Sequence, residues 1–213
     1  LGASGVGLLS LITSAYGFFT TFALSGVNLA ASRIVAEGLR HENEAEIRGG
    51  MKRCLIYSFI FGSAATLAMF FSAAPLGNYV IADARSIRSL RILAPSLLPL
   101  AMSSGIYGYL HAVRRVIKSP SAQITEQVIR IIVTVAALSV FLPKGLEFAC
   151  FAVTLGTTVS EIFAFVYNFA IFKHDIRKHF HGEGTEPDGL TKKMLGISIP
   201  MALSAYMRSG LLT

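Results

Sequence analysis

The stretch that decides the fold is residues 54–76, CLIYSFIFGSAATLAMFFSAAPL, in which 23 consecutive residues carry no charge. The hydrocarbon core of a bilayer is about 30 Å thick, and a helix crosses it with roughly 20 apolar residues. The stretch also lacks the ten-residue alternating pattern of outer-membrane β-strands. It therefore predicts a transmembrane α-helix.

Other apolar segments of the chain have the same character. We expect an all-α, polytopic transmembrane bundle with about six spans, forming a single domain over residues 1–213. The expected spans are residues 5–32, 54–76, 92–113, 121–142, 147–172 and 194–213. Pro95 falls in the first turn of the third span, where a proline costs a helix least. The chain begins at Leu1 and stops inside an apolar segment, so we expect a piece of a longer protein.

The composition supports a membrane protein and argues against other classes. Of the 213 residues, 53% are hydrophobic and 15% are charged, whereas soluble domains carry about 25% charged residues. The net charge of +7 does not indicate nucleic-acid binding, because the basic residues flank apolar segments. The two cysteines, Cys54 and Cys150, lack metal or redox spacing. We therefore expect no metal site and no cofactor.

The basic residues also predict the topology. The loops at residues 33–53, 114–120 and 173–193 hold thirteen Lys and Arg residues, and the intervening loops hold four. The positive-inside rule places the first set in the cytoplasm of a plasma-membrane protein. We expect residues 33–53 to form a short solvated helix between spans. The histidines of the last loop are expected to be solvated rather than to bind metal.

Charged residues at span depth are the candidate functional residues. An ionisable side chain there costs about 2.5–3.5 kcal/mol on insertion scales. Glu126 and Arg130 lie in the fourth span, Glu161 in the fifth and Arg208 in the sixth. Arg33 lies at a cytoplasmic helix end, where it is either a topology anchor or a ligand contact.

The roles of these charges are open at this point. Glu126 and Arg130 are four residues apart on one helix face, so they form either a self-neutralising pair or the lining of a polar cavity. Glu161 either bonds a neighbouring helix or pairs with Arg130 or Arg208. The depth of Arg208 favours a cavity position. No loop contains a Ser/His/Asp set or a phosphate-binding glycine loop, so the sequence does not predict an enzyme.

Six segments carry a resemblance to a known group of exporters. They are GVGL at 5–8, SGVNLAASRIVAE at 25–37, LAPS at 93–96, GIYGY at 105–109, SPSAQITEQVIR at 119–130 and IPMALS at 199–204. With these segments the chain resembles the polysaccharide-transporter, stage V sporulation protein B-like branch of the multidrug/oligosaccharidyl-lipid/polysaccharide (MATE-like) exporter superfamily. The resemblance implies two six-helix lobes around a central cavity, alternating access, and a role in the cell envelope and sporulation. It also implies that this chain is most of the N-terminal lobe and that the C-terminal lobe is its partner.

The leading functional hypothesis is therefore a flippase or exporter of lipid-linked oligosaccharide or polysaccharide precursors. Arg130 and Arg208 would attract the pyrophosphate of the carrier lipid, and Glu126 and Glu161 would orient them or couple transport to an ion. The alternative within the superfamily is a cation-coupled multidrug exporter, in which Glu161 would be the main acidic residue for cationic drugs. A third reading, a membrane transferase or a scaffold for envelope enzymes, requires a loop motif that this sequence lacks.

Overall fold

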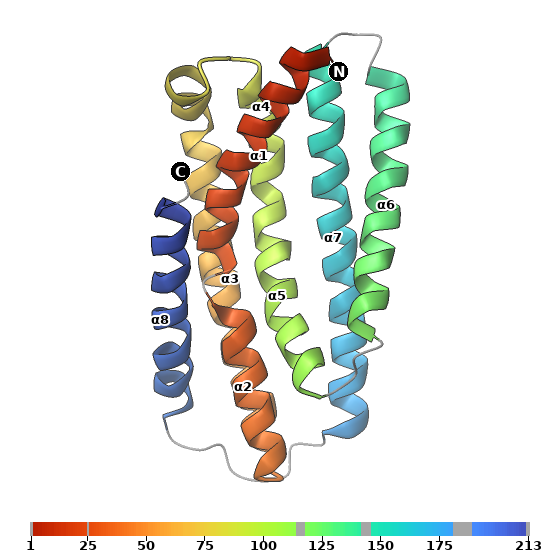
Figure 1. Cartoon of the computed structure of the whole chain (residues 1–213). Helices are drawn as coiled ribbons and strands as arrows, with labels where there is room; N and C mark the ends of the chain where they lie inside the picture. Colours follow the sequence, from red (N-terminus) through yellow and green to blue (C-terminus); the bar gives the residue numbers. More distant parts are fainter. Residues whose placement is uncertain (1, 25, 114–117, 142–145, 181–188, 212–213) are drawn as a thin grey trace.

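The computed structural model describes residues 2–24, 26–113, 118–141, 146–180 and 189–211, and these form a bundle of long, roughly parallel helices (Figure 1). The helices are α1 (Gly2–Leu24), α2 (Val27–Arg40), α3 (Glu44–Pro75), α4 (Ser86–Leu93), α5 (Leu97–Ala112), α6 (Lys118–Phe141), α7 (Leu146–His179) and α8 (Leu190–Leu211). The described residues contain no β-strand. The all-α expectation is confirmed.

These eight helices form six long helical rods, because α1 continues into α2 and α4 continues into α5 (Figure 1). Four helical stretches among the described residues are long and apolar enough to cross a membrane: Gly5–Arg40, Glu44–Val80, Ser86–Ala112 and Phe148–His179. Large apolar side chains such as Phe71, Ile60 and Phe163 stand exposed on the outside of the bundle. Such faces match lipid rather than water. The chain is a multi-pass membrane protein.

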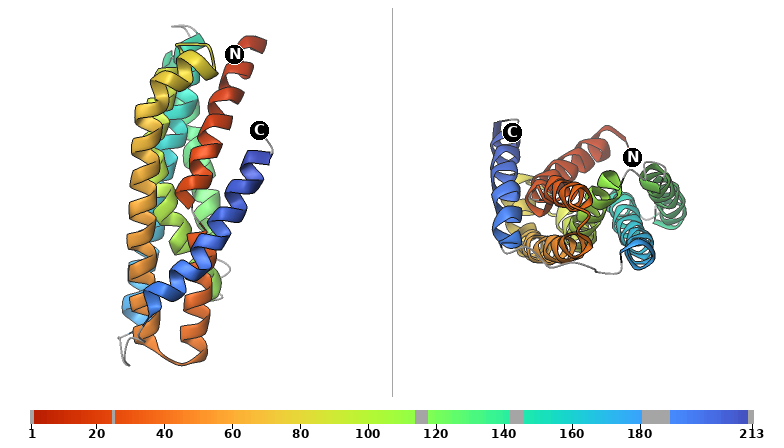
Figure 2. Two further views of the ribbon diagram at one scale, coloured as in Figure 1. Left: turned by 90° about the vertical axis from the view of Figure 1, so that its left-hand side faces the viewer. Right: turned by 90° about the horizontal axis from the view of Figure 1, so that it is seen from below.

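The first rod breaks at Gly26, which separates α1 from α2. This glycine has a φ of 70°, in the left-handed region that a residue with a Cβ rarely adopts. A Cβ there would also lie 2.8 Å from the Cβ of Met201 on α8. Glycine therefore permits both the change in helix direction and the close approach of α8, which crosses the bundle obliquely (Figure 2).

Residues 33–53 differ from the expected solvated helix between two spans. Arg33 belongs to α2, which runs to Arg40, and α3 begins at Glu44 after a turn of three residues. The side chain of Asn43 caps α3 by accepting a hydrogen bond from the Glu46 amide over 3.2 Å. The prediction was wrong because the charges occupy the ends of two helices that extend beyond their apolar windows.

The third rod begins earlier than expected. It is helical from Ser86, six residues before the predicted start of the span at residue 92. Pro95 therefore lies inside the rod, in a tight turn of residues Ala94–Ser96 that joins α4 to α5. A proline lacks the backbone N–H that continues an α-helix, so a local tightening of the helix at this position is expected.

Two glycines bring α5 against its neighbours. A Cβ at Gly108 would overlap the backbone carbonyl of Asn28 on α2, and one at Gly105 would lie 3.4 Å from the Ser58 hydroxyl on α3. The side-chain amide of Asn28 donates to the Ser104 carbonyl over 3.1 Å across the same contact. Small residues allow such backbone contact between membrane helices. Gly105 and Gly108 therefore allow α5 to pack closely against α3 and α2.

The turns of the bundle gather at two ends. The 41–43 turn, the end of α5, the end of α7 and the start of α8 share one end, while the start of α4 lies at the other (Figure 1). Alternate connections thus fall on the same side, as a chain that crosses a membrane repeatedly requires. The fifth expected span is also longer than predicted, because α7 continues through residues 173–179 to His179.

Candidate functional site

A charged centre lies between α6 and α7. One guanidinium nitrogen of Arg130, Nη2, donates to Glu126 Oε1 over 2.7 Å and to Glu161 Oε1 over 3.1 Å. Glu126 is one turn before Arg130 on α6, and Glu161 reaches across from α7. The structure therefore joins three of the sequence-predicted residues through a single arginine.

The position and burial of this centre make its charges significant. Arg130 is near the middle of α6 and Glu161 is near the middle of α7. The side chains of Glu126 and Glu161 are 13% and 8% exposed, against 31% for Arg130. Charges shielded from water interact strongly. One guanidinium faces two carboxylates, so the centre carries a net charge of −1 when both carboxylates are ionised.

Hydroxyl groups on α7 hold the geometry. The Nε of Arg130 donates to the Ser160 hydroxyl over 3.2 Å, and that hydroxyl donates to the Thr157 carbonyl over 2.8 Å. The hydroxyl of Thr158 donates to the backbone carbonyl of Ile92 over 2.8 Å, which ties α7 to α4. The Arg130 guanidinium is therefore oriented by three side chains, those of Glu126, Glu161 and Ser160.

The sequence reasoning missed a polar ladder along α7. Glu161, Asn168 and Asp175 are spaced by seven residues, which places them on one helix face, and all three are buried. The amide of Asn168 donates to the Tyr107 hydroxyl over 3.0 Å, and the Tyr109 hydroxyl donates to Asp175 Oδ2 over 2.8 Å. The seven-residue spacing is the signal that could have found them.

Asp175 also corrects the predicted loop at residues 173–193. The residue was expected in a solvated segment, yet it is fully buried within α7. His174 and His179 belong to the same helix, and the His179 ring nitrogen Nδ1 lies 3.2 Å from the Asp175 carbonyl. His181 lies outside the described residues. Among the described residues, no group of three His, Cys, Asp or Glu side chains is arranged to hold a metal ion.

Of the two remaining predicted residues, Arg33 lies apart from this centre. Arg33 is 64% exposed and pairs with Glu37 one turn later on α2, over 3.5 Å. Arg208 falls in the last turns of α8, and its side chain lies outside the described residues. The roles predicted for these two residues stay predictions.

A second ion cluster ties α8 to the end of the bundle. The Lys193 ammonium pairs with Glu37 on α2 and lies 3.1 Å from Glu46 Oε1 on α3. The Glu46 side chain is 3% exposed. The hydrogen bond to the Glu37 carboxylate raises the pKa of Lys193 above its usual value. This cluster sits where the sequence predicted solvated loop residues.

Comparison with known proteins gives the fold a context. Residues 1–209 match the family described as polysaccharide biosynthesis protein. Stage V sporulation protein B of Bacillus subtilis is 25% identical over 211 residues, which cover 97% of this chain and 41% of that protein.

Two solved structures share the helical arrangement. A MATE protein in complex with Br-NRF superposes with a TM-score of 0.73 at 18% identity, covering 98% of this chain and 47% of that one. An inward-facing multidrug resistance MATE family transporter of the MOP superfamily gives a TM-score of 0.63 at 13% identity, covering 95% and 50%. The chain spans half or less of the length of each of these relatives. By its family match and its helical architecture, the chain belongs to the polysaccharide biosynthesis protein family and has a MATE-like fold.

Proposed function

We propose that the protein exports a lipid-linked oligosaccharide or polysaccharide precursor across the plasma membrane by alternating access. The family match and the MATE-like fold support an exporter. The observation that carries the proposal is the charged centre of Arg130, Glu126 and Glu161, which lies in the middle of two adjacent helices. Ionisable residues at such depth typically mark a substrate or ion pathway.

The proposed substrate carries a pyrophosphate, for which a guanidinium is a strong ligand. Arg130 is held by two carboxylates, so a bound pyrophosphate would compete with one of them for its N–H groups. The displaced carboxylate would then be available to a proton or a cation, which would couple substrate binding to an ion. In this proposal Arg130 binds substrate, Glu126 and Glu161 carry the coupling charge, and Arg208 adds a second cationic contact.

Orientation and partners complete the proposal. The end of the bundle that holds the 41–43 turn would face the cytoplasm, because the loops predicted there hold thirteen of the chain's nineteen basic residues. The relatives are at least twice as long as the part that this chain matches. We propose that a second set of helices completes the cavity, and that the protein moves its substrate without a chemical step.

The test is a flipping assay on full-length protein in liposomes, with a fluorescent undecaprenyl-pyrophosphate sugar. Arg130→Ala and Arg208→Ala are each expected to lower the flipping rate at least about tenfold, since a hydrogen bond to a charged group is worth about 1.5–3 kcal/mol. Arg130→Lys keeps the charge and is expected to retain part of the activity. The matched control is Arg85→Ala, because Arg85 is 51% exposed and pairs with Asp83 between two helices.

An active Arg130→Ala variant that is incorporated at the wild-type level would remove Arg130 from the mechanism. Loss of flipping in the Arg85→Ala control would show that the assay reports general damage. Elution from a sizing column and the amount of protein in the liposomes must match the wild type for either conclusion.

A second candidate is a cation-coupled multidrug exporter. The net charge of −1 at the centre favours it, because such a site attracts a cationic solute. In this case liposomes would show gradient-driven efflux of a cationic dye and no flipping of the lipid-linked sugar. Glu161→Gln is then expected to abolish dye efflux, since it removes the charge excess.

A further inference from the structure

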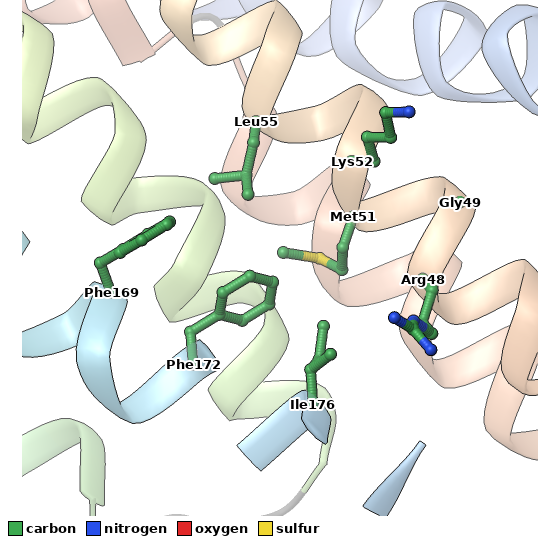
Figure 3. A pocket seen from close by; sticks show the side chains of 8 residues that line it. All are labelled: Arg48, Gly49, Met51, Lys52, Leu55, Phe169, Phe172 and Ile176. Carbon is green, nitrogen blue, oxygen red and sulfur yellow. The ribbon is translucent and has the colours of Figure 1, made fainter. Parts of the chain in front are cut away.

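A groove on the outer surface of the bundle combines a basic rim with an apolar floor. It lies between the start of α3 and the end of α7, with a volume of about 350 Å³ (Figure 3). Its basic residues are Arg48 and Lys52, and its apolar lining includes Leu55, Phe169, Phe172 and Ile176. Figure 1 places these helix ends at the same end of the bundle as the 41–43 turn.

The two basic residues are one turn apart on α3, and both are exposed. Arg48 Nη1 donates to the Phe180 carbonyl over 3.5 Å, which leaves its other guanidinium N–H groups for a ligand. Within the described part of the chain, neither Arg48 nor Lys52 is ion-paired to a carboxylate. The rim therefore offers two positive charges to an anion.

The floor is arranged along the direction in which a lipid chain would run. Leu55 follows Lys52 toward the middle of α3, and Phe169 precedes Phe172 toward the middle of α7. Figure 3 shows the Phe169 and Phe172 rings and the Leu55 side chain bordering the same space. Polarity thus changes from basic at the helix end to apolar toward the bundle centre.

We infer that this groove binds an anionic phospholipid of the surrounding bilayer, with its phosphate at Arg48 and Lys52 and an acyl chain along Leu55 and Phe169. Basic pockets between transmembrane helices at the membrane surface select anionic head groups in this way. A soluble anion would gain nothing from the apolar floor, whereas a lipid uses both parts. The inference does not depend on which solute the protein moves.

The test uses tryptophan quenching by brominated lipids. The chain contains no tryptophan, so Phe169→Trp reports on the groove once any tryptophan elsewhere in the full-length protein is replaced by phenylalanine. Phe163→Trp on the same helix is the matched control, because Phe163 is 55% exposed and does not line the groove. Leu55→Trp is the second reporter if Phe169→Trp does not fold.

Brominated phosphatidylglycerol is compared with brominated phosphatidylcholine at both positions. The groove reporter is expected to prefer the anionic lipid by roughly fivefold for each basic residue, and the control position is expected to show no preference. Adding Arg48→Gln and Lys52→Gln is expected to abolish the preference of the groove reporter. Both residues are exposed, so folding is expected to be retained.

Two results would overturn the inference: equal lipid preference at the two positions, or a preference that survives neutralisation of both basic residues. Displacement of the brominated lipid by undecaprenyl pyrophosphate, at a mole fraction far below that of phosphatidylglycerol, would also overturn it and assign the groove to the carrier lipid. Since the assay measures occupancy without transport, its failure would leave the proposed function untouched.

Discussion

The hydroxyl of Tyr109 on α5 donates a 2.8 Å hydrogen bond to the carboxylate of Asp175 on α7, and both side chains are fully buried. This contact fixes two helices at the end of the bundle where the sequence predicts a loop. A carboxylate that is buried so completely depends on the donors that its fold supplies.

Tyr109→Phe removes this hydroxyl with little change of shape. We expect the free energy of unfolding to fall by about 1.5–3 kcal/mol, the usual contribution of a hydrogen bond to a charged group. Thermal unfolding in detergent measures the change. Tyr79→Phe is the control, since Tyr79 is 86% exposed and should leave the midpoint unchanged. A stable Tyr109→Phe protein would show that other donors suffice for Asp175.

Lys193 is expected to hold the start of α8 against α2 and α3. Lys193→Gln should speed hydrogen exchange of residues 190–198 several-fold, because partly exposed ion pairs contribute about 1 kcal/mol or less each. The neighbouring Lys192→Gln is the matched control, since Lys192 is exposed. Equal hydrogen-exchange rates of residues 190–198 in the two variants would show that Lys193 does not hold the start of α8.

The same cluster predicts a dependence on pH. Because the folded pKa of Lys193 is raised, its contribution to stability is fully present below the ordinary lysine pKa of 10.5. It is lost as pH rises through the raised value. The exchange difference between wild type and Lys193→Gln should therefore persist at neutral pH and vanish only in strong alkali.

Gly108→Ala tests the contact between α2 and α5. The new Cβ would overlap the Asn28 carbonyl, so the helices must separate, and we expect a loss of about 1–3 kcal/mol in unfolding free energy. Gly17→Ala is the control, because a Cβ there meets nothing within 4 Å. In a helix interior that change should be neutral or stabilising by up to about 1 kcal/mol. Thermal unfolding should therefore give a lower midpoint for Gly108→Ala than for Gly17→Ala.

The charged centre predicts an unusual pattern in a double-mutant cycle. Arg130→Gln leaves two carboxylates without their shared guanidinium and should destabilise the fold by about 1–3 kcal/mol, with allowance for the 31% exposure of Arg130. Adding Glu161→Gln to Arg130→Gln should recover part of the lost stability, because it removes one of the two unpaired carboxylates. Additive effects in thermal unfolding would show that the three charges act independently.

The fold class could be predicted from the sequence because long apolar runs have few structural solutions in a membrane. The pairing of Glu126 with Arg130 could be anticipated from their spacing on one helix. Glu161 was assigned several possible partners, and the choice of Arg130 could not be made, because it depends on how α6 packs against α7.

The errors lie where helices extend past the apolar windows. Charged residues at 33–53 and 173–179 resemble loops in composition, yet tertiary contacts bury Glu46 and Asp175 among partners distant in sequence. Pro95 similarly suggested a helix start, whereas the rod begins at Ser86 and continues through Pro95 by way of the tight turn Ala94–Ser96. Composition reports affinity for water, and it does not report which polar groups find partners.

The ladder on α7 has a mechanical consequence. Its members Glu161, Asn168 and Asp175 recur about every 10.5 Å along the axis, at 1.5 Å per residue, and each meets a separate partner on α5 or α6. Sliding α7 along its axis or rotating it by one residue would break all three of these hydrogen bonds at once. These contacts hold α7 in register with α5 and α6. Under the proposed alternating access we expect the three helices to move as one rigid piece, and we expect bending at the break at Gly26.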